Sequence, residues 1–328
     1  MERIYTVKLR LMAALVLLAL LFVACTPAAT APSAAEPAAG MGLTPVLTAP
    51  AMALPVPVTT TVQVVKDVEY GRGGGLPLYL DIYIPETPIM KPLPAVVFIH
   101  GGGWRSGDKF PSQVRSLAEC GFFAVSINYR LSGVATFPAA VEDCKCAVRW
   151  LRANAAKYNV DPNRIGVWGG SAGGHLSLMV GCAGETAGLE GNGGWEKYSS
   201  RVQAVCSYYG PADLAHMQDG DTTAPAQFLG GTPAEKPEAY RLASPVTHVT
   251  PDDPPLLMVH GESDRVVPYA QSMIMQQAYL KLGLEVELVK VLNAGHGFQP
   301  VADKAISPTQ KDIFQKVLDF FVQKLCRP

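Results

Sequence analysis

The chain has 328 residues, of which 48% are hydrophobic and 17% are charged. This composition is typical of a globular protein with a sizeable buried core, and it excludes disorder for most of the chain. The 27 basic and 28 acidic residues nearly cancel, so the sequence offers no electrostatic footprint for nucleic acid or anionic lipid surfaces. The length suits one α/β domain with additional segments.

Residues 1–25 have the features of an export signal. Basic residues precede an apolar stretch, 11–24, that is too short to span a bilayer comfortably. Its end resembles a bacterial lipobox, in which Cys25 is lipidated and becomes the mature N-terminus. Phe22 replaces the usual leucine of that motif, so simple cleavage after Cys25 is the alternative. We expect a cell-membrane lipoprotein that faces outside the cytoplasm and contacts the membrane only through this anchor.

Residues 26–60 form an Ala/Pro-rich linker with Glu36 as their only charge. Such a composition cannot bury a core and favours extended conformations, so we interpret it as a tether. The catalytic domain is then expected to span 61–328.

Six cysteines follow Cys25, and an exported setting permits disulfides, although no spacing specifies a pairing. Cys144 and Cys146 are two positions apart on a predicted helix and face different directions, which argues against a bond between them. They also lack the ligand spacing of a zinc site.

From residue 62 the chain alternates β-branched or aromatic runs with helical stretches, which is typical of βα units around a mostly parallel sheet. Glycines and Pro77 separate the first two predicted strands, so we expect an antiparallel hairpin at the sheet edge. The eight predicted strands cover 62–68, 78–84, 95–99, 123–128, 165–168, 202–208, 256–259 and 287–291.

Two helices are predicted beside this sheet. Apolar residues recur at three- and four-residue steps over 141–155, which gives a helix with one apolar stripe. A closing helix is expected to begin with Ser307 as N-cap, Pro308 at the first helical position and Gln310 three residues after the cap. The long connection 211–254 is rich in Ala, Pro and Gly, and connections of this kind are usually functional or act as lids.

A glycine-rich motif directly follows the predicted strand 165–168. Its sequence, GGSAGG over 169–174, matches G-x-S-x-G in the strand-to-helix context that a nucleophile elbow requires. Small residues on both sides of Ser171 allow a tight turn, and the helix N-terminus behind it favours negative charge. We therefore identify Ser171 as the candidate nucleophile. The alternative, which we consider weaker, is a glycine-rich turn that contains a serine by chance.

A second glycine-rich segment follows the predicted strand 95–99 and reads HGGGW from His100. In loops of this type the amide groups can point at a developing oxyanion. We assign Gly102, Gly103 and the amide of Ala172 as the donors of an oxyanion hole. His100 is expected to hold the loop, and a merely flexible turn is the alternative interpretation.

The acid of a serine triad on such a sheet lies between the serine and the histidine in the chain. Asp264 meets this condition, because it follows the predicted strand 256–259 in a loop at the carboxyl edge of the sheet. Glu262 is the rival, and either side chain could instead be a solvated loop carboxylate.

The base is chosen by the same order. His296 follows Asp264 and has a glycine on each side, which lets its imidazole reach across the loops; a surface histidine is the alternative. The five histidines that precede Asp264 fail this test: His100, His175, His216, His248 and His260.

These three residue types perform covalent catalysis together. A serine hydroxyl is a poor nucleophile until a base removes its proton, and the base needs a carboxylate that holds its tautomer and stabilises the imidazolium. The predicted cycle is acylation of Ser171, protonation of the leaving alcohol by His296, and attack of water on the acyl-enzyme. It requires no metal and no organic cofactor.

The segments HGGGW with GDK following, GGSAGGH, GESDRVVP and AGHGF together resemble α/β-hydrolase esterases of the hormone-sensitive-lipase-like and bifunctional feruloyl/acetyl-xylan esterase-like (BD-FAE-like) groups. The resemblance covers 62–325 and implies an α/β-hydrolase fold and carboxylesterase activity, often toward short-chain or plant-cell-wall esters. Hormone-sensitive-lipase-like enzymes carry a helical cap before the first strands, where this chain has signal and linker. The capless group therefore fits better, without a large N-terminal cap, and any lid comes from 211–254.

Two other functions stay open. A serine peptidase of the same fold uses the same triad, although the HGGG loop favours esters. A hydrolase-like binding protein usually lacks a triad member, and this chain has all three. The expected partner is a small-molecule ester. Four aromatic residues are candidates for its pocket, with the plain core as the alternative location: Trp104, Tyr208, Tyr209 and Phe298.

Overall fold

The computed structural model describes residues 59–109, 112–217 and 220–326. The predicted signal segment, Cys25 and linker residues 26–58 lie outside this part of the chain. The amide of Thr60, the last residue assigned to the linker, donates a hydrogen bond to the Glu119 carbonyl at 3.0 Å. No helix within the described ranges is long and apolar enough to cross a membrane.

Eight strands form one sheet in the order β1-β2-β4-β3-β5-β6-β7-β8. β2 pairs antiparallel with β1 and β4, and every other neighbouring pair is parallel, which confirms the mostly parallel eight-stranded sheet. The strands are β1 (Val62–Gly73), β2 (Leu76–Pro85), β3 (Leu93–Ile99), β4 (Phe123–Ile127), β5 (Val160–Gly170), β6 (Ala204–Tyr208), β7 (Leu256–Gly261) and β8 (Val286–Val291).

The predicted edge hairpin is present, and its strands are longer than the sequence suggested. Gly71 pairs with Leu78 and Gly73 pairs with Leu76, so two of the glycines expected in the turn belong to the ladder. The turn itself is Gly74–Gly75, where both residues have the positive φ that glycine tolerates at no steric cost.

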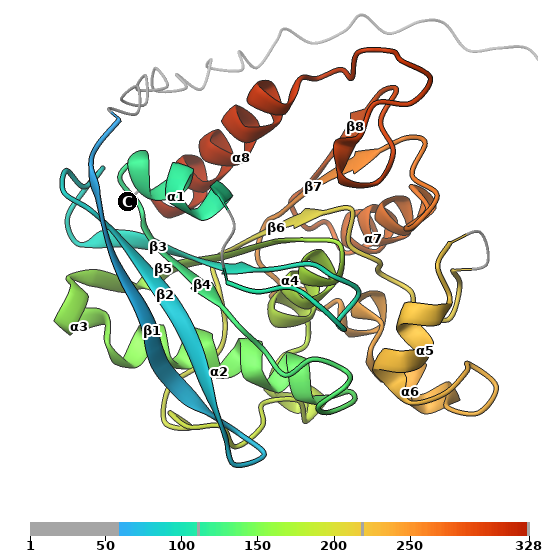
Figure 1. Cartoon of the computed structure of the whole chain (residues 1–328), viewed down its shortest axis with the longest axis horizontal. Helices are drawn as coiled ribbons and strands as arrows, with labels where there is room; N and C mark the ends of the chain where they lie inside the picture. Colours follow the sequence, from blue (N-terminus) through green and yellow to red (C-terminus); the bar gives the residue numbers. More distant parts are fainter. Residues whose placement is uncertain (1–58, 110–111, 218–219, 327–328) are drawn as a thin grey trace, which may run out of the picture. The chain divides into compact units, whose positions relative to one another are not determined.

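Helices cover both faces of the sheet (Figure 1). α1 (Ser112–Glu119) and α8 (Gln310–Leu325) contribute to the smaller hydrophobic core on one face. α2 (Ala139–Ala153), α4 (Ala172–Cys182) and α7 (Ala270–Lys281) contribute to the larger core on the other face. The predicted helix 141–155 is thus confirmed for most of its length, but α2 ends at Ala153 and a single turn, α3 (Ala155–Tyr158), follows it.

The start of the closing helix differs from the prediction. The N-cap of α8 is Thr309, not Ser307, and Pro308 precedes the helix. The Thr309 side chain accepts from the Asp312 amide, and the Asp312 carboxylate accepts from the Thr309 amide, which completes a capping box. This reciprocal pair satisfies two backbone groups, and so it determines where the helix begins.

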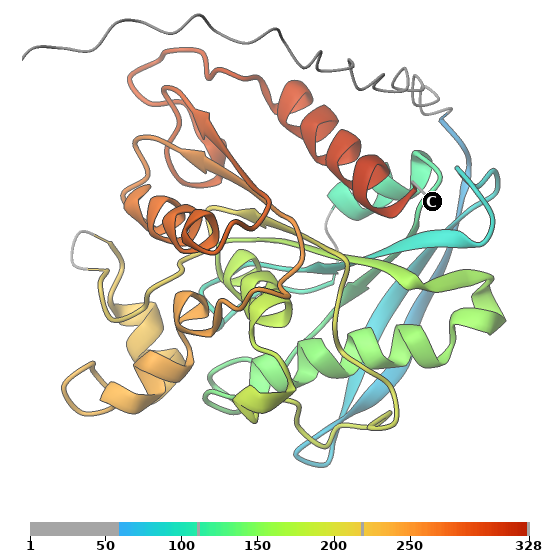
Figure 2. The same cartoon turned by 180° about the vertical axis from the view of Figure 1, so that it is seen from behind.

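In the described part of the long connection 211–254, which excludes 218 and 219, there are three short helices: α5 (Thr223–Leu229), α6 (Pro237–Leu242) and the 3₁₀ turn η2 (Pro245–His248). α5 and α6 lie close together beyond one end of the sheet in both views (Figures 1 and 2).

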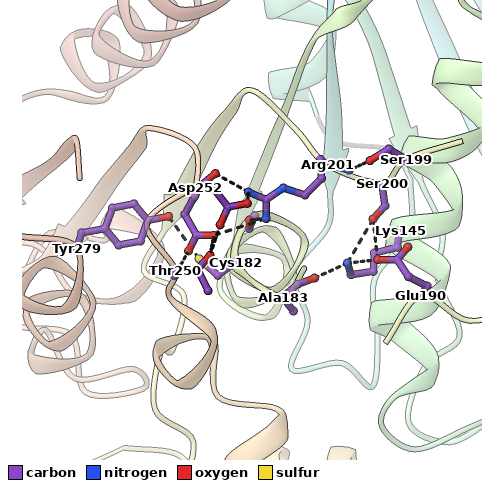
Figure 3. Close-up of polar contacts among 12 residues, drawn as sticks. Lys145, Cys182, Ala183, Glu190, Ser199, Ser200, Arg201, Thr250, Asp252 and Tyr279 are labelled. Carbon is purple, nitrogen blue, oxygen red and sulfur yellow. Dashed lines mark hydrogen bonds and ion pairs between the residues drawn. The ribbon is translucent and has the colours of Figure 1, made fainter. Parts of the chain in front are cut away.

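A buried polar network holds the connection between α4 and β6 against α2 (Figure 3). The Lys145 ammonium, on α2, donates to Glu190 at 2.6 Å and to Ser200 at 3.3 Å, and it also contacts the Ala183 carbonyl. A 3₁₀ turn, η1 (Glu185–Ala187), lies in the same connection. The six cysteines of the described residues are all unpaired, including Cys144 and Cys146.

Candidate active site

The turn between β5 and α4 places Ser171 in a strained conformation. Its φ of 56° and ψ of −122° are unusual for a residue with a side chain, and its amide donates to the Tyr208 carbonyl at 2.8 Å. The glycines of the motif permit close packing behind it. A Cβ added at Gly173 would lie 2.1 Å from the Ile99 carbonyl oxygen, so no larger residue fits there.

Ser171, His296 and Asp264 form one hydrogen-bonded chain. His296 Nδ1 lies 2.7 Å from Asp264 Oδ2, and since a carboxylate only accepts, this nitrogen carries the proton. His296 Nε2 is then free to accept from the Ser171 hydroxyl at 3.0 Å. The three side chains come from loops after β5, β7 and β8, and the histidine opens the 3₁₀ turn η3 (His296–Phe298).

The Asp264 carboxylate is buried and is surrounded by donors. Its Oδ1 accepts from the amides of Val266 and Val267 at 2.8 and 2.9 Å. Burial by itself raises the pKa of this carboxyl, but hydrogen bonds from His260 and His296 outweigh it and hold the pKa well below its usual range. Asp264 is therefore ionised at every pH at which the protein is expected to work.

The rival carboxylate, Glu262, is exposed and points elsewhere. It accepts a hydrogen bond from the Asn293 amide at 3.0 Å and makes no hydrogen bond or ion pair with a histidine among the described residues. Between the two candidates, the structure brings only Asp264 to His296.

Gly102, Gly103 and Ala172 lie beside the same cavity as Ser171 and His296. The cavity has a volume of about 560 Å³. The φ angles of Gly102 and Gly103, 107° and 60°, are ones that glycine tolerates best, and they bend the loop after β3 toward the serine. The loop after β3 therefore borders the same cavity as the nucleophile.

Two histidines outside the triad support the site, and the sequence did not predict a role for one of them, His260. His100 stacks on Tyr129 at 4.4 Å, and burial lowers its pKa, in keeping with the expected structural role. His260, which the order test discards, is fully buried with its Nε2 at 3.4 Å from Asp264 Oδ2. Its place in the HGESD segment, four residues before the acid, is the only signal that the sequence offers.

Two of the four aromatic candidates border the cavity, and three of the four are buried in the hydrophobic core. Trp104 and Tyr209 border the cavity, and the Tyr209 ring lies 4.7 Å from the His296 ring. Tyr208 and Phe298 belong to the core cluster on the α8 face. The polar residues that border the cavity were not foreseen: Arg105, Ser106, Gln113 and Asp221.

Within the described residues, no group of three or more His, Cys, Asp or Glu side chains is arranged to hold a metal ion. The hydrogen-bonded serine, histidine and aspartate can carry out nucleophilic catalysis, because the histidine can take the proton of the serine hydroxyl.

The chain was compared with known protein families, and the model of the BD-FAE family matches residues 80–279. Among individual proteins, it is 32% identical over 264 residues to esterase LipQ of Mycobacterium tuberculosis. That alignment covers 78% of this chain, but only 61% of the length of LipQ.

Solved structures with the same architecture include a truncated carbohydrate esterase from gut microbiota, with a TM-score of 0.69 and 31% identity over 83% of this chain and 99% of the other. Esterase 2 of the planctomycete Thermogutta terrifontis matches with a TM-score of 0.64 and 28% identity, over 80% of this chain and 91% of the other. It has also been solved with propionate and with butyrate bound. These likenesses confirm the expected α/β-hydrolase fold.

Proposed function

Because the chain belongs to the BD-FAE family, we propose that it is a carboxylic-ester hydrolase that acts through Ser171, His296 and Asp264. The observation that carries the proposal is the continuous hydrogen-bonded chain from the serine hydroxyl to a buried, ionised carboxylate.

The reaction follows from the directions of these hydrogen bonds. His296 Nε2 takes the Ser171 proton as the hydroxyl oxygen attacks the ester carbonyl, and the imidazolium that forms is stabilised by Asp264. Collapse of the tetrahedral intermediate expels the alcohol, which takes that proton. A water molecule, deprotonated by His296, then attacks the acyl-enzyme and releases the acid. Amides of Gly102, Gly103 and Ala172 stabilise the oxyanion in both steps.

For the substrate we propose short-chain esters and esters linked to carbohydrate. Four polar residues border the cavity and offer hydrogen bonds to the hydroxyl groups of a sugar: Arg105, Ser106, Gln113 and Asp221. The bound propionate and butyrate of the Thermogutta esterase and the carbohydrate esterase from gut microbiota support the same choice.

The deciding experiment is a hydrolysis panel on wild type and Ser171→Ala. It contains nitrophenyl esters of increasing chain length, methyl ferulate, acetylated xylan and an aminopeptidase substrate. We expect cleavage of short esters that Ser171→Ala abolishes. Intact esters, or full activity of Ser171→Ala, would overturn the proposal, and preferential cleavage of the peptide substrate would favour the peptidase alternative.

The sugar preference has a separate test in Gln113→Ala. This variant should lower kcat/KM for acetylated xylan several-fold while kcat/KM for nitrophenyl acetate stays close to that of wild type. An equal loss on both substrates would contradict a role of Gln113 in recognition of the alcohol.

We further propose that the protein is exported and that Cys25 carries a lipid anchor. The charged and apolar pattern of residues 1–25 and the lipobox-like end of that segment support this. Fractionation of cells that produce the full chain should find wild type in the membrane, and Cys25→Ser released from it. Recovery of wild type in the soluble fraction would favour simple cleavage of the signal.

A further inference from the structure

The loop after β3 holds a tryptophan in an unfavourable backbone conformation. Trp104 has a φ of 57°, in the left-handed region that residues with a Cβ rarely adopt. It directly follows Gly103, so the position of Trp104 anchors the C-terminal end of the glycine segment. Its carbonyl accepts from the Ser132 amide at 2.8 Å, and the side chain is buried. Further contacts must compensate for this conformation.

The first of these contacts is a hydrogen bond to His175. Trp104 Nε1 lies 3.2 Å from His175 Nδ1, and His175 Nε2 lies 2.7 Å from the Ala243 carbonyl. Because a carbonyl only accepts, the proton of the neutral imidazole sits on Nε2 and leaves Nδ1 to accept from the indole. The His175 ring is fully buried, and burial lowers its pKa to about 4, so it is neutral near pH 7.

His175 also belongs to the element that carries the nucleophile. It lies in the first turn of α4, and its amide donates to the Ser171 carbonyl at 2.9 Å. One imidazole therefore connects the loop after β3, the helix behind Ser171 and the end of the α6 region at Ala243.

The second support is one face of α5. The Phe228 ring is stacked on the Trp104 indole at 4.7 Å and meets the His175 ring edge-on at 5.8 Å. One turn earlier, Ala224 packs so closely that a Cβ added at Gly103 would lie 3.3 Å from its own Cβ. Positions 224 and 228 share a helix face, and this face meets the loop.

A polar contact lies next to these apolar ones. Arg105 Nη1 donates to Gln227 Oε1 at 3.3 Å, on the adjoining position of α5. The segment 211–254 is the expected source of any lid. Its α5 helix packs against the glycine loop as a support.

We propose that Trp104, His175 and Phe228 form a positioning unit that holds the Gly103 amide in place for the oxyanion. The inference rests on the proposed ester hydrolysis. His175 and Phe228 do not border the cavity, so they act through Trp104 rather than on the substrate. Oxyanion donors work because they are fixed before the reaction begins, and a loop with this backbone needs such supports.

The test compares Trp104→Phe with a matched control, Trp168→Phe. Trp104→Phe retains a ring for the Phe228 stack but loses the donor to His175. Trp168 is also buried, and its Nε1 has no hydrogen-bond partner in the described part of the chain, so the control removes the same atoms without breaking such a bond. A second pair of variants is His175→Leu and His175→Gln. Leucine cannot accept a hydrogen bond from the Trp104 indole, whereas glutamine can, so their comparison shows whether an acceptor at position 175 restores activity.

The readouts are kcat and KM for nitrophenyl acetate and the rate at which a fluorophosphonate labels Ser171, followed by intact mass. We expect Trp104→Phe and His175→Leu to lower kcat and labelling by about 10- to 100-fold with little change in KM, because the missing contact acts in the transition state. His175→Gln should recover part of the loss, and Trp168→Phe should resemble wild type.

An unchanged kcat in Trp104→Phe would overturn the positioning proposal. So would a fall in kcat that is equal in Trp104→Phe and Trp168→Phe and that parallels the fall in their Tm. Neither result affects the proposed function, because wild type remains active in both cases. A wild type that neither hydrolyses esters nor reacts at Ser171 refutes the proposed function itself, and the positioning role with it.

Discussion

His260 Nε2 lies 3.4 Å from Asp264 Oδ2, the same oxygen that accepts the hydrogen bond from His296. The two imidazoles nevertheless differ in their second partners. His296 faces the Ser171 hydroxyl, whereas His260 Nδ1 faces the Ser272 hydroxyl at 2.7 Å, inside the protein. Only one of them can exchange a proton with a substrate in the cavity.

Replacement of the two histidines should therefore have unequal effects. His296→Ala removes the base, and kcat should fall by about 10³-fold or more, as expected for the loss of a residue that acts as both acid and base. His260→Ala removes a buried ring whose Nε2 lies 2.9 Å from the Val267 carbonyl and 3.4 Å from Asp264 Oδ2, and kcat should fall by no more than about tenfold. Steady-state kinetics on nitrophenyl acetate measures both. Equal losses would contradict the assignment of His296 as the base.

The two carboxylates can be separated in the same assay. Asp264→Asn should lower kcat by about 10⁴-fold, because an amide cannot hold the histidine tautomer or stabilise the imidazolium. Glu262→Gln, which keeps an acceptor for the Asn293 amide, should leave kcat close to the wild-type value. The opposite ranking would make Glu262 the acid.

The buried His175 predicts how stability depends on pH. Its pKa is about 4 in the folded protein, below the ordinary value of 6.5, so the unfolded chain binds more protons between these two values. Stability from this residue is complete above pH 6.5 and is lost as the pH falls toward 4, with a total of about 3 kcal/mol. Urea unfolding of wild type and His175→Gln between pH 4 and 8 checks this: their difference in free energy should change across that window. A constant difference would mean that His175 does not titrate in this way.

Gly173→Ala should reverse the usual preference of a helix. Alanine is normally favoured over glycine within a helix by about 1 kcal/mol. At this position a Cβ would lie 2.1 Å from the Ile99 carbonyl oxygen and 2.6 Å from that of His100, so the substitution should cost about 1–3 kcal/mol. Gly133→Ala, where nothing lies within 4 Å of the added Cβ, is the control. Similar urea midpoints for both variants would rule out the close contact.

The cap of α8 can be tested by Thr309→Ala and Ser307→Ala. Loss of the Thr309 hydroxyl breaks the capping box with Asp312, which should lower the free energy of unfolding by about 1 kcal/mol. Ser307 lies outside the helix, and its replacement should change stability by less than about 0.5 kcal/mol. A larger loss of stability from Ser307→Ala than from Thr309→Ala would favour Ser307 as the N-cap of α8, as the sequence predicted.

Local sequence patterns predicted the sheet and the arrangement of Ser171, Asp264 and His296. Each of these side chains follows a strand in a short glycine-containing or acidic loop, and the chain order of such loops constrains which residues meet. The start of α8 was wrong because Ser307 and Thr309 are both good caps, and only the reach of Asp312 decides between them.

Contacts between segments that are distant in the chain could not be predicted from local sequence patterns. Trp104 and His175 are 71 positions apart, and no periodicity or motif links them. The place of His260 beside Asp264 was missed because chain order was the only criterion, and order does not reveal which other side chains pack next to the acid. The length of the hairpin strands was underestimated because glycine was taken to mark turns, although Gly71 and Gly73 pair within the ladder.

The hydrogen bond between Ser171 and His296 joins atoms that are 125 positions apart along the chain. Contacts of such separation form only after the intervening loop has been closed, at an entropic cost. The strands that hold both residues, β5 and β8, are brought into place by β6 and β7 between them. The proposed hydrolysis therefore requires nearly the whole sheet: a chain still emerging from the ribosome has no complete site until His296 has been synthesised and β8 has joined the sheet.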